Sequence, residues 1–209
     1  MKVGQISKPK FARLAFTIRG DAPYVSNKFS SEAREIMREK QAAGATAAKG
    51  KKREPKDFAA CAAASMHLST DGWPGLPASA IRQAMISACR LVGFKMVLAK
   101  LSVFVEQDGF DADDDTPLIK FTRGEPKQCE HATRNETGVA DIRARMRWAP
   151  GWESVVRVRY DADQFTASDV EALMERVGVQ VGLGAGRPDS KKSAGMNWGT
   201  FQVVDVKTI

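Results

Sequence analysis

The sequence predicts an α+β fold made of short strands, a few helices and long connecting segments. Three observations predict it: an alternating segment followed by a helical pattern near the start, two arginine-rich alternating segments followed by an amphipathic helix, and a glycine-rich segment before a last alternating one. With 209 residues, 43% of them hydrophobic, the chain can bury a core of its own, and we expect a single domain over residues 1–209.

The first 70 residues hold one clear strand and one clear helix. FARLAFTIRG alternates apolar and polar residues, which predicts a strand over 11–19. SSEAREIMREKQAAG offers serines for an N-cap and a glycine as a stop, which predicts a helix over 30–44. The next residues are small and cationic with no apolar anchor, so we expect a mobile basic insertion near 44–57. Small side chains over 58–68 fit a helix or a strand equally well.

The middle of the chain begins with a turn rich in glycine and proline, TDGWPGLP. Apolar residues at helical spacing then predict a helix over 78–92, and KLSVFVEQ predicts a strand over 100–107. The acidic run EQDGFDADDD opens a segment that we expect to be an irregular insertion near 107–140.

The last third supplies the remaining elements. Segments 142–148 and 154–160 read as a hairpin across the turn APGWE, with arginines on one face and apolar residues on the other. TASDVEALMERVG predicts a helix capped by Thr166 or Ser168. Strands are expected on either side of a glycine-rich loop, over 179–183 and 200–206. This order predicts a ferredoxin-like or RNA-recognition-motif-like core with insertions.

The positive charge is concentrated near the start of the chain. The formal net charge is +7, yet residues 1–60 hold 14 Lys and Arg against 6 Asp and Glu, and the remainder is close to neutral. Such a local excess favours a polyanionic partner, although a merely soluble basic surface would look the same. No apolar run is long enough to span a bilayer and no secretion signal is visible, so we expect a cytoplasmic protein without a membrane partner.

Catalytic and metal-binding patterns are weak. Only two histidines occur, His67 and His131, and neither adjoins a nucleophile motif; His67 and Asp71 are the weak catalytic candidates. The acidic run lacks the glycine and glutamate spacing of a calcium loop and is expected to be solvated. The three cysteines lack the paired spacing of a zinc site, so we expect no metal and no cofactor.

The segment GLGAGRPDSKKSAGMNWG is more informative. It is neither a Walker loop nor a convincing dinucleotide fingerprint, because Arg187 stands where a third glycine is needed. Glycines such as Gly184 and Gly186 make backbone amides approachable, and nearby cations would hold the phosphates of a nucleic-acid strand. These cations are Arg187, Lys191 and Lys192. Trp198 could stack on a base, or it could be a core residue at the start of a strand.

Two motifs resemble the RAMP superfamily, the repeat-associated mysterious proteins. DGWPGLPASAIRQAMISACR is similar to its strand–turn–helix element, in which a Gly/Pro turn precedes small residues, a serine, an aliphatic residue and a cation. These positions are Gly75, Leu76, Pro77, Ala78, Ser79, Ala80, Ile81 and Arg82. GLGAGRPDSKKSAGMNWGTFQV is similar to the superfamily's glycine-rich loop before a last strand. The two motifs follow each other in the expected order and cover about half of the chain.

The resemblance implies an RNA-holding core like that of CRISPR effector backbone subunits, or a phage or mobile-element relative of them. We therefore expect a non-enzymatic protein that binds single-stranded RNA or DNA and assembles side by side along the strand as a homo-oligomer or filament. The glycine loop would hold phosphates, and so would further cations at Lys51, Lys52, Arg53 and Arg82. Two alternatives stay open: a RAMP-type ribonuclease that uses His67 or Asp71, and a structural protein of a virus particle.

Overall fold

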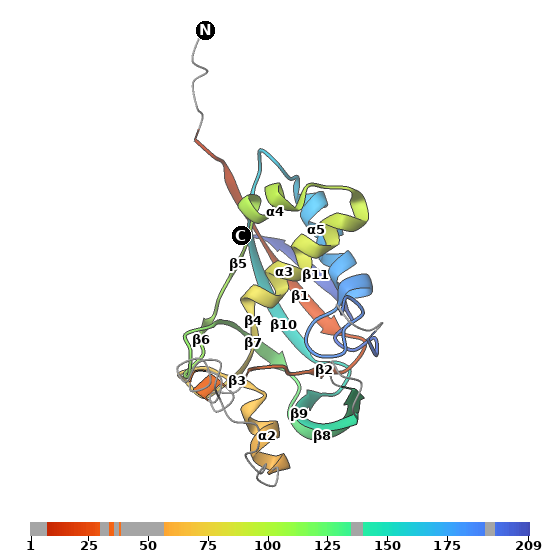
Figure 1. Ribbon diagram of the computed structural model, residues 1–209. Helices are drawn as coiled ribbons and strands as arrows, with labels where there is room; N and C mark the ends of the chain where they lie inside the picture. The colour runs from red at the N-terminus through yellow and green to blue at the C-terminus, as the bar shows by residue number, and fades with distance from the viewer. Residues whose placement is uncertain (1–7, 30–33, 36–37, 39–56, 135–139, 191–194) are drawn as a thin grey trace.

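The main sheet brings together strands from the two ends of the chain and its middle. The computed structural model describes residues 8–29, 34–35, 38, 57–134, 140–190 and 195–209. Four strands of the sheet lie side by side, each antiparallel to its neighbour, in the order β11 (Phe201–Thr208), β1 (Phe11–Gly20), β10 (Glu153–Asp161) and β5 (Val103–Glu106). Figure 1 shows β1 and β10 running through the centre of the molecule.

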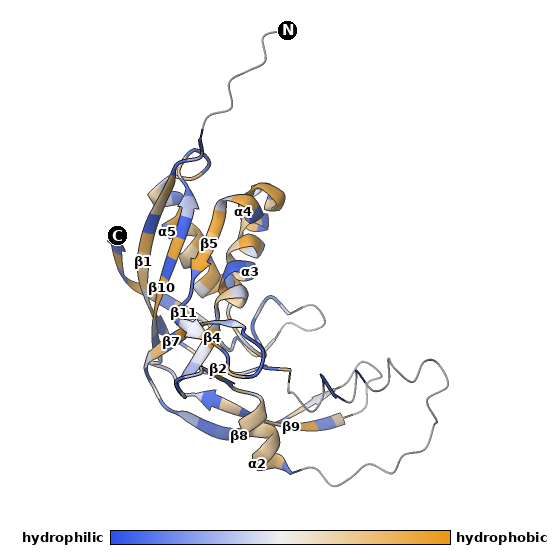
Figure 2. Cartoon of the chain, turned by 90° about the vertical axis from the view of Figure 1, so that its left-hand side faces the viewer, coloured by the Kyte–Doolittle hydropathy of each residue, from blue (hydrophilic) through white to orange (hydrophobic). Residues whose placement is uncertain are grey.

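Two principal helices cover one face of this sheet. Helix α3 (Ala78–Ala88) lies in the chain between β1 and β5, and α5 (Ala167–Arg176) lies between β10 and β11. Seen from the side, α3 and the short helix α4 (Met96–Ser102) stand on one side of β1 and β10 (Figure 2). Alternate residues of both strands, such as Phe16 and Val158, are buried and pack with α3 and α5 in one core.

Helix α5 and the turn after it follow from their sequence. Thr166, one of the two predicted caps, begins α5 and forms a capping box with Asp169. Buried residues at positions 170, 173, 174, 177 and 181 then continue a helical spacing. The predicted strand over 179–183 is therefore wrong: residues Val177–Val181 form a turn of π-helix that extends α5.

The main sheet continues beyond β10 through four further short strands. Strand β7 (Pro117–Arg123) also pairs with β10, near Glu153, and carries β4 (Pro74–Pro77) and β6 (Gly109–Phe110). Strand β3 (His67–Leu68) pairs with β4 at the edge. The segment over 107–140, expected to be irregular, thus contributes strands, because its apolar residues Leu118, Ile119 and Phe121 are buried.

A second, three-stranded sheet lies below the main sheet in Figure 1, and we call it the lower sheet. It consists of β2 (Tyr24–Val25), β9 (Ala140–Trp148) and β8 (Pro126–Arg134). Helix α2 (Phe58–Ala64), which resolves the ambiguity over 58–68 and begins at the N-cap Asp57, packs against β9. A cluster of aromatic rings joins the two sheets, with centroids 4.5–6.0 Å apart: Tyr24, Phe121, Trp148 and Trp152.

The expected hairpin of 142–148 with 154–160 is also wrong. Strand β9 pairs with β8 in the lower sheet, whereas β10 pairs with β1 in the main sheet. The fully buried Trp148 and Trp152 flank the turn between them and fill the junction of the two sheets. Burying both indoles separates the strands that the alternating pattern alone would pair.

Helix and strand bounds differ from expectation at two further places. The helix predicted over 78–92 is α3 followed by a 3₁₀ turn, Cys89–Val92. The strand predicted over 100–107 begins only at Val103, because Met96–Ser102 is helical. No helix in the described part of the chain is both long enough and apolar enough to cross a membrane.

Candidate nucleic-acid interface

The glycine loop is described over residues 182–190 and 195–199, and its backbone contacts β2. The amide of Ala185 donates to the carbonyl of Val25 at 2.9 Å. Gly184 has φ +73°, and a Cβ there would lie 2.4 Å from the same carbonyl oxygen. Gly184 is thus required for close approach as well as for its left-handed backbone.

Trp198 packs between the glycine loop and strand β8. A Cβ on Gly186 would lie 2.7 Å from the Trp198 ring, and that ring meets His131 of β8 edge to face with centroids 5.3 Å apart. Trp198 therefore connects the glycine loop to the lower sheet, and only its partly exposed remainder is available to a base.

Two charged residues of the loop have internal partners. Arg187 donates to the carbonyl of Gly184 at 3.0 Å, and its side chain borders a cavity. Asp189 accepts hydrogen bonds from Ser87 and, at 2.8 Å, from Arg90. The Ser87 hydroxyl and then the Arg90 guanidinium hold the pKa of Asp189 below its usual range, against the opposing effect of burial. The loop is thereby fixed to the end of α3.

A cavity of about 180 Å³ lies between α3 and the glycine loop. Its walls are largely apolar, with Leu76, Ala80 and Ala84 on one side and Leu183 on the other. The polar side chains at its border are Asn27, His67, Gln83, Ser87, Arg187 and Asp189. The cavity brings the two sequence motifs together, since one supplies α3 and the other supplies the loop.

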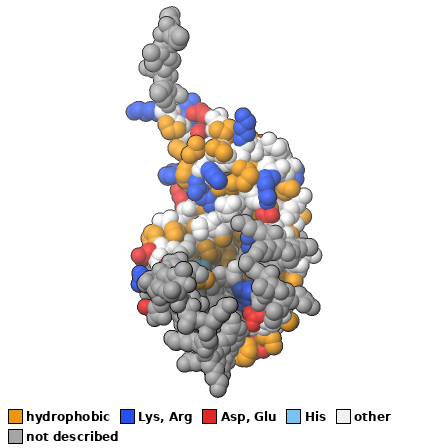
Figure 3. Space-filling model, viewed as in Figure 1, with side chains coloured by type: hydrophobic (Ala, Val, Ile, Leu, Met, Phe, Trp, Pro, Cys, Tyr) orange, Lys and Arg blue, Asp and Glu red, His pale blue; other side chains and the backbone are white. Residues whose placement is uncertain are grey.

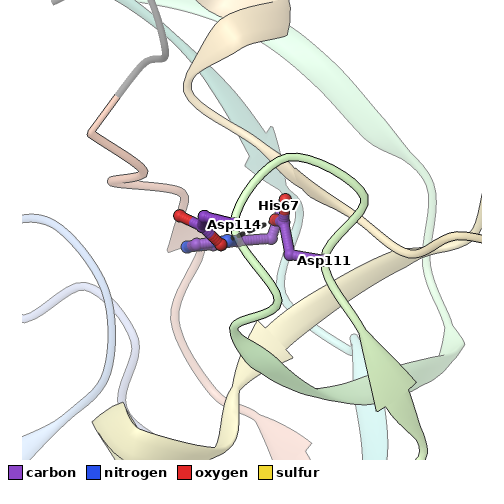
Figure 4. Close-up of side chains that lie close together, drawn as sticks. All are labelled: His67, Asp111 and Asp114. Carbon is purple, nitrogen blue, oxygen red and sulfur yellow. Dashed lines mark hydrogen bonds and ion pairs between the residues drawn. The ribbon is translucent and has the colours of Figure 1, made fainter. Parts of the chain in front are cut away.

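His67 belongs to a buried ionic network (Figure 4). Its Nδ1 lies 2.7 Å from Oδ2 of Asp111, whose other oxygen accepts from Lys28 at 2.7 Å. The Lys28 ammonium also contacts Asp113 at 2.6 Å. Asp111 is 0% exposed, so the expectation of a wholly solvated acidic loop is wrong at this residue.

The pKa shifts in this network favour its ionised form. Burial alone would raise the pKa of Asp111, but hydrogen bonds from Lys28, the Asp113 amide and His67 outweigh it and lower that pKa. Burial would likewise lower the pKa of Lys28, but Asp111 and Asp113 outweigh it and raise that pKa. Both charges therefore persist at neutral pH.

The same cluster has the residue types of a metal site. His67, Asp111 and Asp114 offer ligand atoms close enough together for one cation. However, Asp111 already neutralises Lys28, and Asp114 pairs with Arg34 at 2.9 Å. A divalent cation would have to displace these internal cations, so the residues do not fit a metal.

The other predicted residues are placed as follows. Asp71 is exposed in the turn between β3 and β4 and does not border the cavity. Arg82 donates hydrogen bonds to the carbonyls of Val103, at 2.8 Å, and of Lys100. Its guanidinium therefore binds the backbone at the junction of α4 and β5. Five predicted cations lie outside the described residues: Lys51, Lys52, Arg53, Lys191 and Lys192.

Sequence analysis placed arginines on one face of the segment 142–148 but gave them no binding role. In the structure they contribute to a basic surface on the lower sheet, which we call the hairpin face. In the β8–β9 register, Lys127 lies opposite Arg147, Cys129 opposite Arg145, and His131 opposite Arg143. Directly opposed residues share one face of a sheet. The signal was present in IRARMRW as three arginines at every second position.

The hairpin face is continuous with the cavity and weakly neutralised. Arg145 donates to the carbonyl of Ser26 at 2.9 Å and also contacts Asn27, which borders the cavity. Burial and then the neighbouring Arg143 lower the pKa of Arg145. Burial, Arg145 and Arg143 lower the pKa of His131. Among the described residues, the acidic partner within reach of these cations is Asp141, 3.6 Å from Arg143.

The open face of the main sheet is different, because three of its arginines have acidic partners and a fourth, Arg159, lies over the rings of Phe11 and Phe104. Arg13 contacts Glu106 at 2.9 Å, Arg19 contacts Glu153 at 2.7 Å, and Arg157 contacts Asp108 at 2.6 Å. Much of the positive charge on this face is therefore neutralised, so the face offers less to a polyanion. The hairpin face and the adjoining cavity are therefore the better candidate for binding nucleic acid.

Comparison with known proteins supports the fold. No protein-family model and no curated protein matches the sequence. A solved structure does match: one chain of Type III-B Cmr-beta, determined by cryo-EM bound to cognate target RNA, with a TM-score of 0.51 and 12% identity. The fold is similar to that of a Cmr-complex chain. The match covers 96% of this chain and 61% of the Cmr chain, so this chain spans about three fifths of its length.

The similarity to this Cmr-complex chain supports the expected α+β fold. A relation to phage or mobile elements stays a prediction.

Proposed function

We propose that the chain is a RAMP-like subunit that binds single-stranded nucleic acid, RNA in particular, without cleaving it. The strand would run from the hairpin face, past Asn27, to the cavity beneath the glycine loop. The observation that carries this proposal is the set of weakly neutralised cations on the hairpin face beside a cavity bordered by Arg187.

The strand order supports the RAMP-like part of the proposal. The two units β1–α3–β5 and β10–α5–β11 share one antiparallel sheet in the order β11–β1–β10–β5. This order is that of a ferredoxin-like core, the same core as in RNA-recognition motifs. The whole of residues 1–209 would then be one domain, with the lower sheet and the basic segment near 44–57 as insertions. The target RNA bound in the similar Cmr-beta structure supports RNA as the ligand.

The proposal is tested by the salt dependence of binding. Changing Lys127, Arg143 and Arg147 to Ala should weaken binding of a labelled single strand and make the salt slope shallower by about 0.7 for each phosphate that is no longer neutralised. The matched control changes three exposed lysines elsewhere: Lys95, Lys100 and Lys207. Two of these lie around α4, on a part of the surface where Lys and Arg side chains lie among hydrophobic ones (Figure 3). Equal reductions of affinity in both variants would show that only net charge matters.

A ribonuclease is the second candidate, because one observation favours it. His67 borders the cavity, and Asp111 orients its ring as the third group of a catalytic triad orients a base. This activity would cut single-stranded RNA in the presence of a chelator and leave 2′,3′-cyclic phosphate ends. Loss of such cleavage on His67→Ala would replace the non-enzymatic proposal, whereas intact RNA supports it.

Side-by-side assembly is part of the proposal. Light scattering after size-exclusion chromatography should show several protomers on a long oligonucleotide and a single protomer on a short one. A structural protein of a virus particle would instead assemble without nucleic acid and bind none, and that outcome would overturn the proposal.

A further inference from the structure

The cavity between α3 and the glycine loop presents a fixed hydrogen-bond acceptor. We propose that Nε2 of His67 accepts a hydrogen bond from a ribose 2′-hydroxyl, so that this site selects RNA over DNA. The inference rests on the proposed function, because it names which single strand the same interface prefers.

The partner of Nδ1 sets the tautomer of His67. An ionised carboxylate can only accept hydrogen bonds, so the contact of 2.7 Å with Asp111 places the proton on Nδ1. Lys28 already balances the charge of Asp111 at 2.7 Å, so the carboxylate does not require an imidazolium as its counter-ion. In the neutral ring, Nε2 then carries a lone pair.

The ring is held firmly and reaches the cavity. The His67 side chain is 10% exposed, and Asp111 is 0% exposed. The backbone on both sides is fixed: His67 pairs with Gly75 across β3–β4, and the Asp111 amide donates to Thr116 at 2.9 Å. His67 lines the cavity, and because Nδ1 faces Asp111, we infer that the opposite edge of the ring, with Nε2, is the edge turned to the cavity. Among the described residues, no hydrogen bond is made by Nε2.

The cavity suits one part of a nucleotide in a chain. Its volume of about 180 Å³ is below the roughly 300–1,000 Å³ of pockets that enclose a free small molecule. Arg187 supplies a cation for a phosphate at the same border. The ribose of that nucleotide is covalently joined to the phosphate, and its 2′-hydroxyl is a donor that DNA lacks.

The experiment compares four labelled oligonucleotides of one sequence by fluorescence anisotropy: RNA, DNA, 2′-fluoro-RNA and 2′-O-methyl-RNA. The wild-type chain should bind RNA roughly fivefold more tightly than the three probes without a donor at the 2′ position. His67→Phe keeps a ring in place without the acceptor and should bind all four alike, at the wild-type DNA affinity. Lys207→Met, an exposed change on β11 outside this interface, is the control and should keep the ratio of RNA to DNA affinity. Thermal melting verifies that each variant is folded.

The outcomes separate the two proposals. Tight but equal binding of RNA and DNA by the wild type overturns this inference and leaves the proposed function standing. An equal reduction for RNA and DNA in folded His67→Phe gives His67 a structural role and also overturns it. If the wild type binds none of the four probes, the proposed function itself fails.

Discussion

Lys28 and Asp111 form an ion pair that is withdrawn from solvent, with the ammonium 2.7 Å from a carboxylate oxygen and side-chain exposures of 4% and 0%. The pair connects the segment after β2 to the loop after β6. Asp111 also binds His67, which lines the cavity. Removing one member of a buried pair leaves the other charge without compensation. The stability of the chain and the geometry of the cavity should both depend on this contact.

Asp111→Asn should lower the free energy of unfolding by about 3 kcal/mol, because Lys28 stays buried with only the half-exposed Asp113 as partner. Urea denaturation measures this decrease. Lys207→Met, which removes an exposed cation paired with Asp205, should change stability by less than about 0.5 kcal/mol. Comparable decreases in the free energy of unfolding for the two substitutions would show that the buried pair stabilises the fold no more than an exposed pair does.

The contribution of Asp111 should depend on pH in one direction. Its pKa is lower in the folded chain than in the unfolded chain, so its stabilisation is present at neutral pH and is lost as the pH falls below about 4. The difference in stability between wild type and Asp111→Asn should therefore shrink on acidification. A difference that stays constant from pH 7 to pH 3 would contradict the lowered pKa.

Gly184→Ala should destabilise the chain more than Gly72→Ala. Both glycines have positive φ, +73° and +80°, so both variants carry a similar backbone penalty of about 1 kcal/mol. Only at Gly184 would the new Cβ also meet a carbonyl oxygen, that of Val25 at 2.4 Å, whereas no atom lies within 4 Å at Gly72. Thermal melting compares the two variants. Equal melting temperatures would show that the loop moves away from the Val25 carbonyl without loss of stability.

Arg187→Ala should weaken binding of all single strands alike, by about fivefold, and reduce the salt slope by about 0.7. Arg187→Lys keeps the charge and should retain most of the affinity, although its ammonium reproduces only part of the hydrogen bonding to the Gly184 carbonyl. If Lys is as harmful as Ala, the residue acts by shaping the loop and not by holding a phosphate.

His131 should report on the hairpin face directly. Its pKa lies below the usual value because of burial and the positive charge of Arg145 and Arg143. NMR titration should show this pKa rising when a single strand binds, because phosphates offset the arginines. Arg143→Ala should raise it without any ligand. A pKa that does not respond to bound nucleic acid would place the binding site elsewhere.

The sequence predicts the elements whose apolar residues repeat regularly. Strands β1, β10 and β11 and helices α3 and α5 were expected near their observed bounds, since alternation or helical spacing reports which face is buried. Pairing is harder, because a strand's pattern shows its buried face but not its neighbour. The arginines of β9 and β10 look alike in the sequence, yet Trp148 and Trp152 direct the two strands into different sheets.

The candidate site was predictable only in part. Arg187 and the glycines are recognisable because their residue types are rare in that combination. The sequence around His67 gives no signal beyond the residue type. Its partner Asp111 lies 44 residues later in the chain, and Lys28, the partner of Asp111, lies 39 residues before His67. Contacts of this kind depend on the complete fold, which spacing along the chain does not encode.

The pairing of β1 has a consequence for how the chain folds while it is being made. Leu14 pairs with Val158 on one side and with Thr208 on the other, so an early strand takes both its neighbours from late segments. At about 5–20 residues per second, ribosomes would need roughly 10–40 s to supply the last neighbour. Until β10 is made, neither edge of β1 has a neighbouring strand, so newly made chains should rely on chaperones that shield unpaired strands.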